Sequence, residues 1–222
     1  MAALIHSRSV YDAFLFDMDG TVLTSIAAAE RVWARWAADH GLDVAAFLPT
    51  IHGKRAIDTV RDSGVPGIDP EAEADAILEA EIADVEGIEP IAGAPEFLAT
   101  LPSDRWAIVT SAPRRLAERR IEAAGLPLPD VIVAGDDVDR GKPAPDGFRL
   151  GAQRLGYAPA DILIFEDAGV GIEAAENAGA SVMVVTAMHS AASHTPHPTI
   201  ADYRDLKTRI LDNGQIHIDT GR

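Results

Sequence analysis

The stretch "FLFDMDGTVLTS", residues 14–25, begins as a hydrophobic strand and then turns into a loop that carries two aspartates. Burying a carboxylate is costly, and two neighbouring carboxylates repel each other unless they share a proton or bind a cation. Asp17 and Asp19 are two residues apart in an extended segment, so their side chains lie on the same side of it. Gly20 then allows a sharp turn, and Thr21 adds a hydroxyl. An ordinary Asp-Gly turn after a strand accounts for the same residues, so these letters alone leave both interpretations open.

Short apolar runs recur along the chain, at residues 12–18, 105–111, 130–135, 161–167 and 180–186. Each run is apolar at nearly every position, which is typical of strands that are covered on both faces. Stretches with helical periodicity lie between them, such as "SAPRRLAERRIEAAGL", which predicts a helix that ends at Gly125. Strands that alternate with helices predict an α/β fold with a mainly parallel sheet.

The alternation is interrupted once, between the first and second strands. Residues 24–88 have a helical pattern, seen in "IAAAERVWARWAADHG" and in the acidic "EAEADAILEAEIADVEG". In the acidic stretch Leu78, Ile82 and Val85 recur at helical spacing, and the Glu and Asp residues at the other positions predict a solvated face. Residues 87–97 are rich in Gly and Pro and predict a hinge that leads back to the sheet.

The composition excludes several classes of function. The 222 residues carry a net charge of -16, which argues against binding to nucleic acids or anionic membranes. Cysteine is absent, which excludes disulfides and thiol catalysis. No apolar run is long enough to span a bilayer, and "MAALIHSRSVYD" has neither the basic start nor the apolar segment of a secretory signal. We therefore expect a cytoplasmic protein, with a monomer as the default because the sequence shows no exposed apolar seam.

Polar residues follow the predicted strands where ligands bind in parallel sheets, beyond the carboxyl ends. Thr110 and Ser111 end the second strand, and their hydroxyls together with the N–H groups of the following helix can hold an anion, although a plain helix cap accounts for them too. Lys142 stands between Gly141 and Pro143 in "GKPAPDGF". The proline fixes the turn and can aim the lysine at a defined point, although an ordinary surface lysine fits equally.

The fourth group is Glu166 and Asp167, which end the strand "DILIF". Asp167 can complete an oxygen-rich Mg²⁺ site with Asp17, and an acidic helix cap is the alternative. Each of the four groups has an ordinary structural explanation when taken singly. Together they place an acidic pair, a hydroxyl site for an anion, a lysine and a further acid at strand ends in a fixed order.

In that order and spacing, the four groups resemble the motifs of the haloacid dehalogenase (HAD) superfamily, in its phosphatase branch with a small helical cap. The matching segments are DxDGT, the hydrophobic run that ends in Thr-Ser, GKPxP and the Glu-Asp pair. The resemblance covers nearly the whole chain. It implies a Rossmann-like, doubly wound parallel sheet as the core domain, residues 1–23 and 89–222, with an inserted α-helical cap domain, residues 24–88.

The resemblance also implies roles for individual residues. Asp17 is expected to attack phosphorus and form an aspartyl-phosphate. Asp19 is expected to protonate the leaving group and then to take a proton from the hydrolytic water. Ser111, together with Thr110, would hold the phosphoryl oxygens, and Lys142 would bridge the phosphate and Asp17.

The same resemblance implies a bound Mg²⁺ ion. Its ligands would be Asp17, the backbone carbonyl of Asp19 and Asp167, with Glu166 supporting them from behind. A strongly acidic protein needs a local positive site in order to bind a phosphate, and Mg²⁺ together with Lys142 would provide it.

Three sequence details bear on the reaction. Dehalogenases of the superfamily lack the second aspartate, so Asp19 argues against cleavage of a carbon–halogen bond. The related β-phosphoglucomutases usually have Val or Ile where this chain has Thr21, which favours hydrolysis over a sugar phosphomutase reaction. Many relatives have Asp at the position of Thr24, on the segment that leads into the cap, so cap closure is expected to differ here. A non-catalytic binding protein on this fold would lack one of the four motifs, and all four are present.

The segment "TIHGKRAIDTV", residues 50–60, resembles a cap segment of sugar phosphatases that act on hexose phosphates such as 2-deoxyglucose 6-phosphate, and of glycerol phosphatases. His52, Lys54 and Arg55 are expected to reach sugar hydroxyls or phosphate, and Gly53 allows the tight turn between them. An ordinary surface loop with basic residues is the alternative. The sequence therefore predicts a Mg²⁺-dependent phosphatase for a small phosphorylated sugar or polyol.

Overall fold

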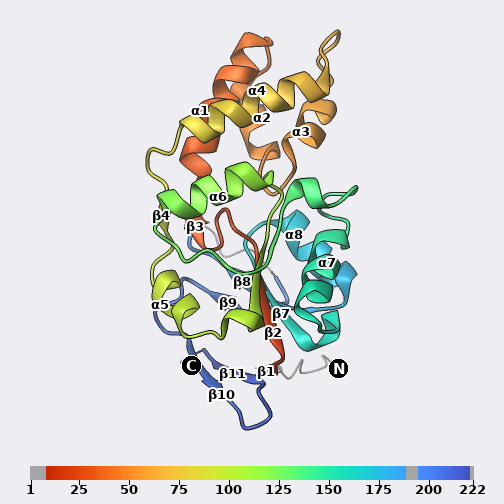
Figure 1. The fold of residues 1–222 in the computed structure, drawn as a ribbon. Helices are drawn as coiled ribbons and strands as arrows, with labels where there is room; N and C mark the ends of the chain where they lie inside the picture. The colour runs from red at the N-terminus through yellow and green to blue at the C-terminus, as the bar shows by residue number, and fades with distance from the viewer. Residues whose placement is uncertain (1–8, 189–194, 221–222) are drawn as a thin grey trace.

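The computed structural model describes residues 9–188 and 195–220. A six-stranded parallel sheet forms the centre of the molecule (Figure 1). In spatial order its strands are β6 (Ile132–Val133), β5 (Trp106–Val109), β2 (Ala13–Phe16), β7 (Ile162–Glu166), β8 (Ser181–Val185) and β9 (Thr199–Ile200). Because β2 lies between β5 and β7, the carboxyl ends of these three strands are neighbours.

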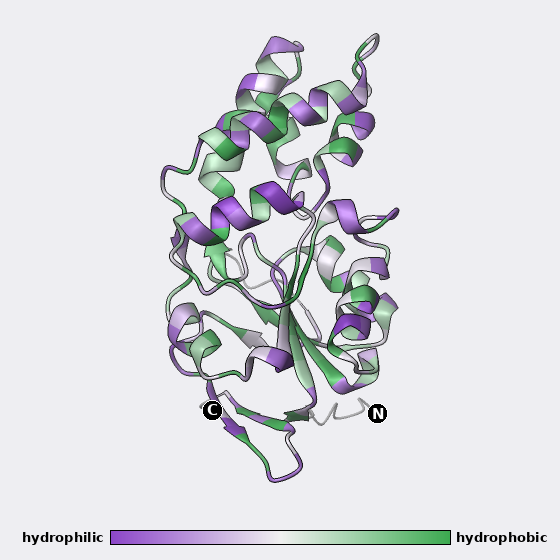
Figure 2. Ribbon diagram, viewed as in Figure 1, coloured by the Kyte–Doolittle hydropathy of each residue, from purple (hydrophilic) through white to green (hydrophobic). Residues whose placement is uncertain are grey.

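Helices cover both faces of this sheet, which explains why its strands are apolar at nearly every position. Phe14 and Phe16 of β2 pack into one hydrophobic cluster, and Ala13 and Leu15 pack into the other. Figure 2 shows the strands as the green, hydrophobic centre of the molecule. The helices are α5 (Ala94–Ala99) and α6 (Arg114–Ala123) on the first face, and α7 (Asp146–Leu155) and α8 (Gly169–Ala178) on the second.

The predicted α/β fold with a doubly wound parallel sheet is confirmed. The five predicted strands are present as β2, β5, β6, β7 and β8, each shorter than its apolar run. A small antiparallel sheet closes the opposite end of the molecule from the helical insert (Figure 1), and its strands are β1 (Val10–Tyr11), β11 (Ile216–Asp219) and β10 (Lys207–Ile210). Short 3-10 helices occur at η2 (Ser103–Arg105), η3 (Gly135–Asp137) and η4 (Pro159–Asp161).

The insert between β2 and β5 is helical and has a hydrophobic cluster of its own, in which Trp33, Trp36 and Ile77 are buried. The chain enters and leaves it through two short antiparallel strands, β3 (Leu23–Thr24) and β4 (Glu89–Pro90). The elements of the insert are α1 (Ile26–Asp39), α2 (Val44–Phe47), η1 (Leu48–Thr50), α3 (Ala56–Asp62) and α4 (Pro70–Ala83). None of the helices in the described ranges is long and apolar enough to cross a membrane.

The prediction of a uniformly solvated acidic face on α4 is wrong at one position. Glu81 is buried, with 7% of its surface exposed, because α4 packs against α6 of the sheet domain. Leu78 and Ile82 of the same helix pack against the cluster that contains Phe14, while Ile77 belongs to the insert's own cluster. Helix α4 therefore links the insert to the sheet domain.

Candidate active site

The two aspartates of the opening stretch lie on a tightly bonded turn that follows β2. The N–H of Asp17 donates to the carbonyl of Phe165 (2.9 Å), which extends the pairing of β2 with β7 by one residue. The chain then folds back, with the N–H of Gly20 donating to the carbonyl of Leu23 (2.8 Å). Gly20 has a φ of +87°, and a Cβ there would lie 2.1 Å from Oδ2 of Asp167. Only glycine allows Asp167 to come so close to this turn.

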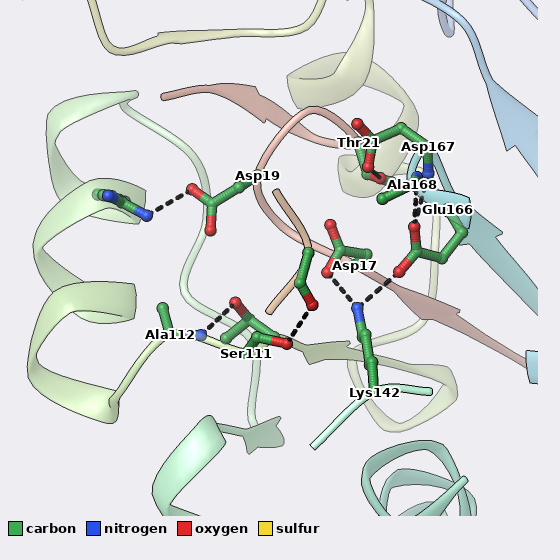
Figure 3. Close-up of polar contacts among 12 residues, drawn as sticks. Asp17, Asp19, Thr21, Ser111, Ala112, Lys142, Glu166, Asp167 and Ala168 are labelled. Atoms are coloured by element: carbon green, nitrogen blue, oxygen red, sulfur yellow. Dashed lines mark hydrogen bonds and ion pairs between the residues drawn. The ribbon is translucent and has the colours of Figure 1, made fainter. Parts of the chain in front are cut away.

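Three carboxylates converge beside this turn. Asp17, Glu166 and Asp167 each offer an oxygen, and these oxygens lie within 4.8 Å of one another. One oxygen of Glu166 accepts the N–H groups of Asp167 (2.7 Å) and Ala168 (2.9 Å), which leaves Asp17 and Asp167 better placed to bind a cation. Thr21 donates its hydroxyl to Asp167 (3.2 Å) and fixes that side chain (Figure 3).

Lys142 is the positive charge of this cluster. Its Nζ lies 2.5 Å from Oδ1 of Asp17 and 2.6 Å from Oε1 of Glu166 (Figure 3). The same Nζ lies 5.0 Å from the centre of the Phe148 ring. Burial acts to lower the pKa of Lys142, but the charges of Asp17 and Glu166 raise it above its ordinary value. Burial raises the pKa of Asp17 to about 7, against the opposing charge of Lys142.

The charge of the cluster indicates what it can bind. Within the described residues, Lys142 pairs with Asp17 and Glu166, and Asp167 places a further buried carboxylate beside them, so the cluster is rich in negative charge. Carboxylate oxygens are also the ligands that Mg²⁺ and Ca²⁺ prefer. The donor set and the charge therefore fit a divalent cation held by Asp17 and Asp167.

Thr110 and Ser111 lie where strand β5 ends, next to Asp17. The Thr110 hydroxyl accepts the N–H of Ala112 (3.1 Å) and shapes the turn into α6. The Ser111 hydroxyl donates to the carbonyl of Gly53 in the insert (2.9 Å). Gly53 is thus brought to the predicted phosphate-binding residues through its backbone.

Asp19 lies apart from the cluster of Asp17, Glu166 and Asp167, and its carboxylate points away from that cluster (Figure 3). It accepts hydrogen bonds from the hydroxyl of Ser25 and from Nη1 of Arg120 (2.9 Å). The other arm of the Arg120 guanidinium donates to Glu81 (3.1 Å). Arg120 belongs to none of the four motifs, although its spacing of four residues from Leu116 on the predicted helix places it on the apolar face.

The predicted basic residues of the insert are all engaged with carboxylates. His52 faces the cavity, with its Nε2 3.3 Å from Oε1 of Glu30. Lys54 also borders the cavity, and its Nζ lies 2.8 Å from Oδ2 of Asp62. Neither side chain touches Asp17, so their predicted contact with a substrate stays a prediction.

Arg55 lies elsewhere. Its guanidinium forms an ion pair with Asp58 (2.6 Å) and donates to the carbonyls of Val138 and Asp139 (both 3.0 Å). These contacts connect the insert to the loop before Lys142. Arg55 borders a neighbouring hollow instead of the cavity that contains Asp17.

A cavity lies between the sheet domain and the insert. The sheet domain contributes the predicted catalytic and phosphate-binding side chains, and the insert contributes a wall that combines apolar and polar groups. Its lining includes Asp17, Asp19, Thr110, Ser111, Arg120 and Asp167 from the first, and Ile26, Trp33, Ile51, His52, Lys54 and Glu81 from the second.

This arrangement is one that known proteins share. Residues 11–179 match the model of the haloacid dehalogenase-like hydrolase family, which is more than half of the chain. The protein therefore belongs to the haloacid dehalogenase-like hydrolases, and the resemblance seen in its motifs and the prediction of an enzyme are confirmed.

Individual relatives define the similarity more closely. The chain is 43% identical over 178 residues to hexitol phosphatase A of Escherichia coli (strain K12), covering 78% of this chain and 82% of that protein. It is 31% identical over 199 residues to 2-deoxyglucose-6-phosphate phosphatase 1 of Saccharomyces cerevisiae (strain ATCC 204508 / S288c), covering 80% and 81%. A crystal structure of a hydrolase from Pseudomonas syringae is similar with a TM-score of 0.70 and 27% identity, covering 78% of this chain and 84% of that one.

Proposed function

We propose that the protein is a Mg²⁺-dependent phosphatase that hydrolyses a small sugar or polyol phosphate through an aspartyl-phosphate. The observation that carries this proposal is the buried carboxylate of Asp17, which contacts Lys142 and lines a cavity with Ser111. The names of the relatives, a hexitol phosphatase and a 2-deoxyglucose-6-phosphate phosphatase, support the substrate class.

In the first step, Lys142 and Ser111 hold the phosphoryl oxygens of the substrate. An oxygen of Asp17 attacks phosphorus, and the bond from phosphorus to the sugar or polyol oxygen breaks. Asp19 gives its proton to that oxygen, so that the product leaves as an alcohol. Asp17 then carries the phosphoryl group.

In the second step, a water molecule attacks the phosphorus and gives a proton to Asp19. The bond between phosphorus and Asp17 breaks, inorganic phosphate leaves, and both aspartates return to their starting states. Asp17, the backbone carbonyl of Asp19 and Asp167 would hold Mg²⁺, with Glu166 in support. The ion would supply positive charge against the phosphoryl oxygens.

We assign residues 24–88 as the cap domain of this enzyme. Their helices form one wall of the cavity, and β3 and β4 are the two connections to the core. Closing such a cap over the phosphate excludes bulk water from the reacting atoms.

The ion pairs of the cavity wall favour hydrolysis of monophosphates over a mutase reaction. A phosphomutase must bind a second phosphate on the far side of the sugar, which requires an available cation. Lys54 is paired with Asp62, and Arg120 is held between Asp19 and Glu81. Separating a buried pair costs about 3–5 kcal/mol, so a second phosphate would bind weakly at Arg120.

The test is phosphate release by the purified protein with Mg²⁺ from hexitol, hexose, glycerol, nucleoside and glycolate phosphates. We expect hydrolysis of the hexitol or hexose phosphates, and loss of that activity in Asp17→Asn, because an amide is a poor nucleophile. Asp212→Asn makes the same chemical change on an exposed turn and should keep full activity. Isomerisation of a sugar phosphate in the presence of its bisphosphate, without hydrolysis, would contradict the proposal and identify a mutase.

A further inference from the structure

Arg120 is a buried charged residue on a helix whose neighbouring positions pack into the core. Leu116, Ala117 and Ile121 of α6 are buried in the cluster under the sheet, and Arg120 has only 5% of its surface exposed. Burial acts to lower the pKa of Arg120, and the charges of Asp19 and Glu81 raise it above its ordinary value. The side chain is therefore a buried cation between two acids.

The two acids come from different parts of the molecule. Nη1 of Arg120 lies 2.9 Å from Oδ1 of Asp19, on the turn that follows β2. Nη2 lies 3.1 Å from Oε1 of Glu81, on helix α4 of the insert. The planar guanidinium holds its donors in a fixed fork, so the position of one acid restricts the position of the other.

Stability alone is a poor explanation for this arrangement. A buried ion pair is often no better for stability than well-packed apolar side chains. In addition, Nε of Arg120 is buried and makes no hydrogen bond to any part of the chain that the structure describes. The guanidinium therefore supplies hydrogen bonds to both acids, while its own Nε stays buried without one.

The contacts also distinguish the two oxygens of Asp19. Ser25 and Arg120 both donate to Oδ1. Oδ2 accepts no hydrogen bond that the structure describes in residues 9–188 and 195–220, so it is the oxygen available to carry a proton toward the cavity. Because two donors hold Oδ1 of Asp19, the carboxylate cannot rotate freely, and the position of Oδ2 is fixed.

We propose that Arg120 is a positioning residue for the proton transfer by Asp19. Arg120 binds Oδ1 of Asp19 and leaves Oδ2 to carry the proton. Because Arg120 also binds Glu81, the orientation of the Asp19 carboxylate depends on the packing of α4 against α6. The proposal rests on the proposed function, since it takes Asp19 as the proton donor.

The nature of the leaving group gives a selective readout. A sugar or polyol leaves as a strongly basic alkoxide unless it is protonated, whereas p-nitrophenolate is a stable anion that needs no proton. The ratio kcat/KM reports the steps up to breakage of the bond to the leaving group, and the later hydrolysis of the aspartyl-phosphate does not enter it. Loss of a correctly placed proton donor therefore lowers kcat/KM for a hexitol phosphate far more than for p-nitrophenyl phosphate.

The experiment measures kcat/KM for both substrates in the full-length protein with Mg²⁺. We expect Asp19→Asn to lose about 10²–10⁴-fold on the hexitol phosphate, the usual contribution of a general acid. Arg120→Met should lose about 10- to 100-fold on the same substrate, as expected when a reacting group is misplaced, and much less on p-nitrophenyl phosphate. Arg120→Lys should fall between wild type and Arg120→Met, because one ammonium cannot reproduce the fork.

Arg119→Met is the matched control, because Arg119 is the neighbouring arginine of α6 and pairs with Glu122 on the surface. It should leave both substrates unaffected. If Arg120→Met does not fold, as judged by circular dichroism, the ratio of the two substrates in Arg120→Lys and Glu81→Gln decides the question. Equal losses on both substrates in the Arg120 variants, with a selective loss in Asp19→Asn, would overturn the role of Arg120 alone. A wild-type protein that hydrolyses neither substrate would overturn the proposed function instead.

Discussion

The two halves of the cavity are built in different ways. On the sheet side, Lys142 contacts both Asp17 and Glu166, and the three side chains are almost completely buried. On the insert side, Lys54 pairs with Asp62 within the insert itself, and in this pair Lys54 is half-buried and Asp62 is exposed. The charges of the sheet side depend on each other, whereas those of the insert side are satisfied locally.

This difference indicates which half of the cavity tolerates amino-acid substitution. Removing one member of a buried cluster leaves its partners without compensation in a region of low dielectric, which is costly. Removing one member of an exposed pair changes little, because water replaces the lost contact. We therefore expect kcat to be far more sensitive to substitution of the buried reacting groups than to substitution of Lys54.

Removing one lysine from each half tests the difference between the two halves most directly. Lys142→Met leaves Asp17 and Glu166 as neighbouring buried acids and removes a donor to the phosphoryl oxygens. We expect kcat to fall about 10³-fold, near the upper end of what one such donor contributes. Phosphate release from a hexitol phosphate with saturating Mg²⁺ measures the effect.

Lys54→Met is the matched change on the insert side. Its ion pair with Asp62 is solvated, so we expect kcat to stay within about twofold of wild type, as for other surface substitutions. A loss in Lys54→Met as large as that in Lys142→Met would show that the insert takes part in the chemistry, and the distinction between the two halves would fail.

The backbone at Gly20 lets Asp167 approach the turn that carries Asp17. In Gly20→Ala the new Cβ would lie 2.1 Å from Oδ2 of Asp167, so that side chain must move away from Asp17. A displacement of about 1 Å in an active site typically costs about 100-fold in rate, and we expect a loss of that size in kcat. The Mg²⁺ concentration needed for half-maximal activity should rise as well, because Asp167 is a proposed ligand.

Gly156→Ala separates this clash from ordinary backbone strain. Gly156 follows α7 with a φ of +83°, close to that of Gly20, and a Cβ there would contact nothing within 4 Å. Both variants should lose stability in chemical denaturation, Gly20→Ala at least as much as Gly156→Ala, while only Gly20→Ala should lose activity and Mg²⁺ response. Equal activity in the two variants would mean that the approach of Asp167 to the turn is unimportant.

The sheet side could be predicted from the sequence because its residues lie at strand ends. In a parallel sheet the carboxyl ends of neighbouring strands meet at one edge. Once the apolar runs were recognised, Asp17, Ser111 and Asp167 were expected at one edge of the sheet, and the structure places them around one cavity. Lys142 lies in the loop after the short strand β6. The GKPxP motif, and not the strand pattern, predicted that this lysine belongs to the site.

The insert side could not be predicted in the same way, because helical periodicity does not say which turns of two helices meet. Glu81 belongs to an acidic stretch that is typical of a solvated face, and Arg120 belongs to a helix rich in surface arginines. Their charges compensate each other across the contact of α4 with α6, and Asp19 also pairs with Arg120. Arg55 contacts the loop at Val138, and its expected contact with a substrate stays a prediction.

The smallest predicted effect is at Thr24, which lies in neither half of the cavity. Its hydroxyl donates to the carbonyl of Gly87 (3.1 Å) and accepts the N–H of Glu89 (3.2 Å), so it connects the two strands between core and insert. An ionised Asp, the residue expected here from the family pattern, could accept but not donate. Thr24→Val keeps the shape and removes both bonds, and we expect the free energy of unfolding to fall by about 1 kcal/mol.

Activity should respond less than stability, because Thr24 contacts no residue that we assign to the reaction. We expect kcat/KM of Thr24→Val to stay within about twofold of wild type, as for changes away from an active site, and Thr24→Ser to match wild type in both measurements. A large loss of kcat/KM at unchanged stability would place the connection between the domains among the determinants of turnover. The rate would then depend on how the insert approaches the sheet domain, and not only on the acids and the lysine at the strand ends.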